Sequence, residues 1–433
     1  MNTESETGPA TRPPSSTEVV VIGGGIAGIA TAWYLHQLGV PVVVCEKGRV
    51  AGEQSSRNWG WIRKQGRDPR ELPLINESLP LWADIAQTLD EDIGWHVGGV
   101  TYLIENAADE ARFTAWLEHA RAHGLDSRLL SVRETQALIP GIRAHHRGAL
   151  HTPSDARAEP AHAVPAMARY LRAAGVTIAE RCAVRTLERA GDRITGVVTE
   201  HGPITCNTVV VAGGAWSRLL LQHHGFPLPQ LQVVSSVQRT TPAPRICASA
   251  IGSAAVSLRP RADGGYSLAK SGAARAEILP ANLRHARAYL PVLRRDWRDL
   301  KFRVGRSFVQ ALRESWDADR TSPFERTRVL DPMPDHAVLD GVLAAARSAY
   351  PQLADVRVAA RWAGAIDVLP DEIPVLGPVP GSTGLLVATG FSGHGFGIGP
   401  AAGRVTAQLA AGQSPCVDLG AFHPARFAGE RAA

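Results

Sequence analysis

Two patterns of apolar residues alternate along the chain, and the first predicts a parallel sheet. Continuous apolar runs, which are typical of strands buried on both faces, occur at residues 19–22, 42–45, 209–212 and 385–389. Apolar residues at helical spacing lie between these runs, as in residues 113–120. This part of the pattern therefore predicts strands that alternate with covering helices.

The second pattern consists of strands joined by turns, and it predicts an antiparallel sheet. These strands occupy residues 231–238, 255–258 and 266–269. Because the two patterns alternate, we expect interleaved domains. We assign residues 18–90, 148–230 and 356–415 to the first domain, and residues 91–147 and 231–355 to the second. The polar, Pro-rich residues 1–17 predict a disordered tail, and residues 416–433 a C-terminal tail.

The stretch of residues 18–47 combines a buried strand, a glycine turn, an apolar helix and a second strand. Gly23, Gly25 and Gly28 have the G-x-G-x-x-G spacing that places a dinucleotide pyrophosphate at a helix N-terminus. Glu46 ends the second strand, where an acid accepts the ribose hydroxyls of adenosine. The alternative is a glycine-rich turn without a ligand, and the complete strand–turn–helix–strand–acid unit argues against it.

A second glycine-rich stretch, residues 390–399, follows a buried strand and precedes a helix predicted over residues 400–411. Its small residues allow backbone N–H groups and a helix N-terminus to approach a planar ligand. His394 lies in this stretch, either as a ligand-binding or catalytic residue or as a residue that packs and orients the backbone. The turn at residues 212–217 predicts a further loop that faces the nucleotide.

Composition and charge exclude several classes of protein. The chain of 433 residues is 45% hydrophobic and 20% charged, as expected of a globular protein with two domains. Its net charge of +5 comes mostly from arginine. The densest basic stretch, residues 294–306, is interrupted by acids, so a solvated surface explains it better than a nucleic-acid or lipid site. No apolar run reaches the length of a membrane span.

The five cysteines are scattered along the chain and form no C-x-x-C pair. This spacing argues against a disulfide scaffold, a zinc site or an iron–sulfur cluster. We therefore expect no metal, and a reducing compartment, the cytoplasm.

Taken together, these motifs resemble the D-amino-acid oxidase (DAO) family of FAD-dependent oxidoreductases over nearly the whole chain. The resemblance rests on residues 21–28, 46–47, 55–57, 209–217, 362–371 and 390–399. It implies an α/β fold in which a Rossmann-like FAD-binding domain is interleaved with an α+β substrate domain built on a mostly antiparallel sheet. Residues 52–57 are most similar to the corresponding segment of the L-amino-acid deaminases in this family.

The resemblance also implies which residues bind the cofactor. The glycine turn and Glu46 would hold the ADP half, the loop after the second strand would lie near the pyrophosphate, and the backbone of Val184 would contact adenine. The implied residues are Gly23, Gly25, Ile26, Ala27, Gly28, Glu46, Lys47, Ser55, Ser56, Arg57, Val184, Ala212, Gly213, Trp216, Gly393, His394, Gly395, Phe396, Gly397 and Ile398. Those from Gly393 onward would line the flavin ring.

Three departures from the sarcosine-type members of the family change what is expected. Residues 362–371 lack the cysteine of a covalent flavin link, so the FAD should be non-covalent. Ser267 stands where those members have an oxygen-activating lysine, so slow reaction with oxygen is expected, although Lys270 is close in sequence. Gly397 replaces a lysine that helps to hold a substrate carboxylate in those members.

An amino-acid carboxylate still requires a cation, and arginine offers a planar, bidentate grip. Arg63 lies closest to the loop arginine of the family, and Arg67, Arg259 and Arg261 are further candidates. Trp59 and Trp61 either wall an apolar pocket or pack at the domain junction.

We therefore expect an enzyme in which FAD oxidises the carbon–nitrogen bond of an amino acid or secondary amine to an imine. Arg63, His394 and Lys270 are the candidate catalytic residues. The electrons would pass to oxygen, a quinone or another acceptor, and the prediction leaves room for a homodimer. Two alternatives stay open, an accessory electron-transfer flavoprotein of a larger dehydrogenase and, less favoured, a flavin monooxygenase. No nucleic-acid partner is expected.

Overall fold

The computed structural model describes residues 12–291, 294, 300–305, 308 and 315–427. Three predictions lie partly outside these residues. They are the tail at residues 1–17, the basic stretch at residues 294–306 and the tail at residues 416–433. Within the described part, none of the helices has both the length and the apolar character that crossing a membrane requires.

A six-stranded sheet forms the first domain, in the order β20-β21-β13-β1-β2-β9. Its strands are β1 (Val19–Ile22), β2 (Val42–Glu46), β9 (Thr177–Glu180), β13 (Thr208–Val211), β20 (Val375–Pro378) and β21 (Leu385–Thr389). All neighbouring strands are parallel except β20 and β21. The continuous apolar runs therefore form buried parallel strands, as predicted.

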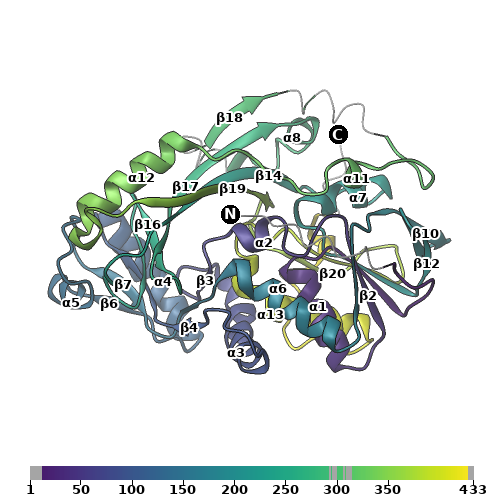
Figure 1. The fold of residues 1–433 in the computed structure, drawn as a ribbon, viewed down its shortest axis with the longest axis horizontal. Coiled ribbons are helices and arrows are strands. Elements are labelled where there is room, and N and C mark those ends of the chain that lie inside the picture. Colours follow the sequence, from purple (N-terminus) through teal and green to yellow (C-terminus); the bar gives the residue numbers. More distant parts are fainter. Residues whose placement is uncertain (1–11, 292–293, 295–299, 306–307, 309–314, 428–433) are drawn as a thin grey trace.

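Both faces of this sheet are covered (Figure 1). On one face lie α1 (Ile26–Gln37), α6 (Pro160–Ala173) and α13 (Gly395–Ala410), with α3 (Leu72–Thr88) packed on α13. On the other face lie α7 (Ser217–His223) and a small sheet of β10 (Val184–Ala190), β11 (Arg193–Thr199) and β12 (Gly202–Thr205). Successive strand residues alternate between these two cores, since Val21 packs with the helices and Val20 with the other face.

A nine-stranded sheet forms the second domain, and α12 (His336–Ala349) covers its outer face (Figure 1). Its strands are β5 (Val100–Leu103), β6 (Arg128–Leu130), β7 (Ala149–Thr152), β14 (Leu231–Thr240), β15 (Ala250–Gly252), β16 (Ser257–Pro260), β17 (Tyr266–Ile278), β18 (Leu300–Val304) and β19 (Val358–Val368). Only the β5–β15 and β17–β18 pairs are parallel. The predicted fold class, with a mostly antiparallel second sheet, is confirmed.

Shorter elements connect the two domains. The strands β3 (Trp61–Ile62), β4 (His96–Val97) and β8 (Ala156–Arg157) form a three-stranded sheet at the junction. The remaining helices of the described chain are α2 (Gln54–Arg57), α4 (Ala107–Ala122), α5 (Val132–Leu138), α8 (Pro280–Arg284) and α11 (Pro323–Arg326). The loop predicted after the second strand thus contains α2 and β3.

Several expected boundaries differ from the structure. Strands β7 and β19 lie in segments assigned to the first domain, yet they pair within the nine-stranded sheet. Strands β4 and β5, which flank Gly98 and Gly99, do not pair with each other, because β4 pairs with β8 and β5 with β7 and β15. Which sheet a strand joins depends on partners distant in sequence, which a local pattern does not reveal.

Both predicted tails are shorter than expected, because residues at their inner ends pack on the protein. Ser15 and Thr17 are hydrogen-bonded to the backbone of Thr205, so this part of the N-terminal segment is ordered. Phe422 is buried, and Arg426 forms an ion pair with Asp371. The residues before 428 therefore pack on the first domain instead of forming a free tail.

Candidate cofactor and substrate site

A large cavity opens at the carboxyl ends of β1, β2 and β13, and it holds about 1240 Å³ of space, some of it open to solvent. The sequence-predicted residues that line it are Gly23, Gly25, Ile26, Ala27, Glu46, Lys47, Ser55, Val184, Ala212, Gly213, Trp216, Gly393, Gly395 and Phe396. Two glycine-rich segments that are far apart in sequence thus meet at one cavity, as expected where parallel strands end.

The turn between β1 and α1 requires glycine at two positions, Gly23 and Gly28. Gly23 has a φ of +115°, which favours glycine. A Cβ atom on Gly28 would lie 1.9 Å from the carbonyl oxygen of Gly23, so only glycine allows helix and strand this close. The N-cap of α1 is Gly25, which has no capping side chain. The helix N-terminus therefore faces the cavity with backbone N–H groups and a positive dipole end, which suits a pyrophosphate.

Glu46 lies at the end of β2 and is held by the backbone on both sides. Its carboxylate oxygens accept hydrogen bonds from the N–H groups of Gly24 and Gly48, each at 2.7 Å. Burial raises the pKa of Glu46 to about 7, although these two hydrogen bonds oppose the shift. The carboxylate occupies the position expected of the acid that accepts ribose hydroxyls.

The opposite end of the cavity is formed by the N-terminus of α13. This helix begins at Gly395, before the predicted start at Pro400, so its first turn lies at the cavity. The loop before it is fixed by Asp367, a buried side chain on β19. Asp367 accepts hydrogen bonds from the N–H of Gly390 at 2.7 Å and from the side chain of Gln230 at 2.9 Å.

The residues present fit an extended dinucleotide cofactor. Gln54 and Ser217 line the cavity, and each has a buried side-chain oxygen, Oε1 and Oγ, without a hydrogen-bond partner in the described part of the protein. Ser55 already accepts the N–H of Ile26 through its Oγ at 2.9 Å, and this contact fixes the loop beside the helix N-terminus. Unpaired oxygens and two helix N-termini suit the hydroxyls, the phosphates and the electron-accepting ring of FAD.

Other predicted cofactor residues lie near the cavity but contact protein instead. Gly28 provides the helix–strand approach described above, and Ser56 is hydrogen-bonded to the carbonyl of Glu53. Arg57 forms an ion pair with Asp331 and donates to the carbonyl of Ala363. Gly397 accepts hydrogen bonds from Ser78 and Trp82, and Ile398 is fully buried. These residues position the wall of the cavity.

The candidate substrate residue Arg63 follows β3, the strand that packs against the first turn of α13. Its guanidinium lies over the ring of Tyr102, 5.5 Å from the ring centroid, and donates to the carbonyl of Gln65. Arg67 is 4% exposed, and its Nη1 has no hydrogen-bond partner among the described residues. Burial, followed by the nearby charge of Arg63, lowers the pKa of Arg67 to about 9.

His394 does not line the cavity, and its ring contacts Glu71 instead. Nδ1 of His394 lies 3.0 Å from Oε2 of Glu71, a carboxylate that is fully buried. Burial, and then Arg67, lower the pKa of His394 below its usual range. Burial would raise the pKa of Glu71, but His394 and Arg67 outweigh burial and hold this pKa below its usual range. A neutral ring donates from Nδ1 to this carboxylate and keeps Nε2 as an acceptor.

The other candidate arginines are already paired. Both Nη atoms of Arg259 bind Glu159, at 2.8 and 2.9 Å, and neither side chain is more than 4% exposed. Arg261 lies 3.4 Å from Glu159 and 3.0 Å from Asp263. This arrangement makes Arg259 a buried structural ion pair and leaves Arg63 and Arg67 as the substrate candidates.

Lys270 is not brought to the site. Ser267 is buried, and its Oγ accepts hydrogen bonds from Arg259 and Arg261, whereas Lys270 is exposed on the same strand. Residues three apart on a strand point to opposite faces, so Lys270 does not reach the position of Ser267. In the described residues no cluster of three or more His, Cys, Asp or Glu side chains is placed to hold a metal.

Trp59 and Trp61 pack together at the junction. Their ring centroids are 5.7 Å apart in an edge-to-face arrangement, and Trp61 also contacts Tyr102. Since Tyr102 lies under the guanidinium of Arg63, these aromatic rings adjoin the candidate substrate residue while they stabilise the junction.

Sequence reasoning missed four features of the site: Asp367, Gln54, Glu71 and the segment at residues 324–329. Asp367 lies within residues 362–371, a stretch whose likeness to the family was noted, so this signal was present. Gln54 lies within residues 52–57, whose likeness to the L-amino-acid deaminases was also noted. Nothing local to Glu71 marks it, because its role depends on burial and on partners from other elements.

Comparison with known proteins agrees with this geometry. The family described as FAD dependent oxidoreductase (DAO) matches residues 18–409. A glycine oxidase from Pseudomonas aeruginosa is 28% identical over 422 residues, which cover 95% of this chain and 99% of the relative. The solved L-amino acid deaminase of Proteus myxofaciens superposes with a TM-score of 0.92 at 30% identity, covering 96% of this chain and 94% of that protein. The deaminase of Proteus vulgaris gives the same TM-score at 28% identity, covering 97% and 99% of the two chains.

The raised pKa of Glu46 predicts how the stability of the flavin-free protein depends on pH. An unfolded glutamate releases its proton near pH 4.5, whereas folded Glu46 keeps it to about pH 7. The folded state therefore binds more protons between these values, and the free energy of unfolding falls as pH rises through this window. Relative to Glu46→Gln, which cannot titrate, the wild type should lose about 1–3 kcal/mol over this range.

Chemical denaturation of both flavin-free proteins at several pH values measures this difference. The substitution adds a constant cost because an amide cannot accept both N–H groups, so the slope and not the offset is diagnostic. Parallel curves for the two proteins would contradict the assignment.

Proposed function

Because the chain belongs to the DAO family of FAD dependent oxidoreductases, we propose that it oxidises the carbon–nitrogen bond of an amino acid. The observation that supports this proposal is the buried Arg67, whose Nη1 has no partner among the described residues and which lies beside Arg63. Paired guanidinium groups suit a substrate carboxylate. The relatives named as a glycine oxidase and L-amino acid deaminases act on substrates of this class.

FAD fits the cavity described above, and it would supply the oxidising step by accepting a hydride from the substrate α-carbon to leave an imine. We propose that it is bound non-covalently. Residues 362–371 contain no cysteine, and Cys45, which lines the cavity, lies at the end of β2 near Glu46, away from the α13 end. Acid precipitation should release the yellow flavin into the supernatant. Colour that stays in the pellet would exclude this mode of binding.

The protein residues would contribute orientation and electrostatics. Arg63 and Arg67 would hold the carboxylate and so fix the α-carbon in a reactive position. The N-terminus of α13 would stabilise the negative charge that develops on the flavin ring. Glu71 would keep His394 in one tautomer at the start of this helix.

The electron acceptor remains a prediction. Buried Ser267 is engaged by two arginines, and Lys270 is exposed, so neither supplies a cation for oxygen activation. This arrangement favours a quinone or another acceptor over oxygen, and rapid, stoichiometric peroxide formation in air would contradict it. All five cysteines are free, which favours a reducing compartment such as the cytoplasm. A homodimer also remains a prediction.

The relatives do not favour the two alternative functions. They are named as amino-acid and amine oxidases, dehydrogenases or deaminases, so an accessory electron-transfer subunit or a monooxygenase is less favoured.

Arg63→Ala should raise KM for an amino-acid substrate by roughly 30- to 1000-fold, because a desolvated guanidinium–carboxylate pair contributes on the order of 2–4 kcal/mol. Arg63→Lys should restore only part of this loss, since a point charge lacks the planar fork. The decarboxylated amine should be affected little by either change. Steady-state kinetics at saturating FAD measures these effects.

The matched control is Arg147→Ala, which removes an exposed arginine paired with Glu110 and should leave KM unchanged. If Arg63→Ala changes KM by less than twofold, Arg63 does not hold the carboxylate, and Arg67 becomes the candidate.

A further inference from the structure

Residues 316–331, which we call the clasp segment, form a wall of the cavity that the sequence did not predict. They follow β18 of the nine-stranded sheet in sequence. They nevertheless pack against the first domain, where Figure 1 shows α11 beside α7. Phe324, Arg328 and Val329 of this segment line the cavity together with Glu46 and Val184. A segment of the substrate half of the chain thus covers part of the cofactor site.

The clasp segment lies at the adenosine end of the cavity. Its backbone approaches Gly48, two residues after Glu46, so closely that a Cβ there would lie 2.1 Å from the carbonyl oxygen of Arg328. Arg328 also donates to the carbonyl of Lys47 at 2.9 Å. Because Glu46 marks the ribose position, the clasp segment lies beside the adenosine half of bound FAD and not at the flavin ring.

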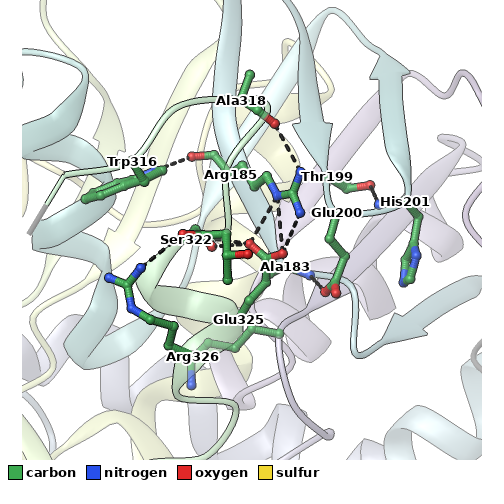
Figure 2. Close-up of polar contacts among 12 residues, drawn as sticks. Ala183, Arg185, Thr199, Glu200, His201, Trp316, Ala318, Ser322, Glu325 and Arg326 are labelled. Carbon is green, nitrogen blue, oxygen red and sulfur yellow. Dashed lines mark hydrogen bonds and ion pairs between the residues drawn. The ribbon is translucent and has the colours of Figure 1, made fainter.

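The first attachment of the clasp segment is the ion pair between Arg185 on β10 and Glu325 on α11 (Figure 2). The guanidinium donates through Nη2 at 2.6 Å and through Nε at 3.1 Å, a bidentate geometry. The carboxylate side chain is 8% exposed and also accepts from Ser322, which caps α11. Although burial opposes it, these contacts lower the pKa of Glu325 to about 2.

A second attachment is the pair between Arg328 and Glu200, with 2.5 and 2.6 Å contacts. Glu200 is itself held by the N–H of Ala183, so the anchor on the cofactor domain is fixed (Figure 2). In addition, Lys47 donates to the carbonyls of Thr327 and Arg328. Charged groups of the cofactor domain therefore hold both the side chains and the backbone of the segment.

Aromatic packing completes the attachment. The indole N–H of Trp316 donates to the carbonyl of Arg185 at 2.8 Å (Figure 2). The ring of Trp316 stacks on His223 with centroids 4.2 Å apart. Phe324 lies edge-to-face against both Trp316 and Trp216. Since Phe324 and Trp216 both line the cavity, this aromatic contact closes its wall.

We propose that residues 316–331 act as an ionic clasp that closes over the adenosine half of FAD and controls how fast the cofactor leaves. The clasp is held by charge pairs to Arg185 and Glu200, and it must open before the adenosine is released. The proposal depends on FAD binding and not on the identity of the substrate, so it can fail while the proposed oxidation holds.

The direct test is Glu325→Gln in the FAD-loaded protein. This change keeps the shape of the side chain and removes the charge that binds Arg185. FAD should dissociate at least about 10-fold faster from this variant, as expected when a charged hydrogen bond is lost. The fluorescence of free flavin after dilution measures the rate of release. High salt should accelerate release from the wild type more than from the variant, because the variant has already lost the pair.

The matched control is Glu91→Gln, which breaks the exposed ion pair between Glu91 and Arg169 on α6, away from the clasp segment. It should leave the release rate within twofold of the wild type. A release rate for Glu325→Gln within twofold of the wild type would overturn the proposal, as would equal acceleration by the control.

A second measurement requires only the wild-type protein and decides the matter if the variant does not fold. Trypsin can cut after Arg326 and Arg328 within the clasp. Bound FAD should slow these two cuts about 10-fold, since cleavage requires local opening. Cuts at both positions whose rates do not change with FAD would contradict a clasp that closes on the cofactor.

Discussion

The structure depends on the contact between β1 and α1 at the glycine turn. No side chain fits between Gly28 and the carbonyl oxygen of Gly23, so the helix can lie against the strand and its N-terminus can face the cavity. The same constraint recurs where α13 crosses α1, because a Cβ on Gly403 would lie 2.4 Å from that of Ala30. Close helix packing thus places two helix N-termini at opposite ends of one cavity, as a long dinucleotide requires.

Buried charges organise the remainder of the site, and nearly all of them are paired within the protein. Asp367 fixes the loop before α13, Glu159 neutralises Arg259, and Glu71 lies between His394 and Arg67. Against this background, the buried Nη1 of Arg67 lacks a hydrogen-bond partner among the described residues, which is why we propose Arg67 for a substrate carboxylate. Arg259, by contrast, is held in a buried ion pair that stabilises the fold.

The parallel strands, the glycine turn and the position of Glu46 at the end of β2 were predictable from the sequence, because each of these signals is local. The sequence pattern placed the start of α13 at Pro400, since proline favours the first turn of a helix and glycine disfavours its interior. In the structure, glycines at 399 and 403 are retained in the helix because α1 packs closely against them. The clasp and the Arg259–Glu159 pair could not be predicted, since their partners lie 140 and 100 residues away in sequence.

The proposed function requires that an amino acid reduces FAD bound in this cavity. The most direct measurement is to mix the yellow protein without oxygen with separate pools of amino acids and of amines that lack a carboxylate, and to follow the visible flavin absorbance. We expect at least one amino acid to bleach the flavin, and its decarboxylated analogue to do so much more weakly at the same concentration. If no amino acid bleaches the flavin, the proposed function is wrong.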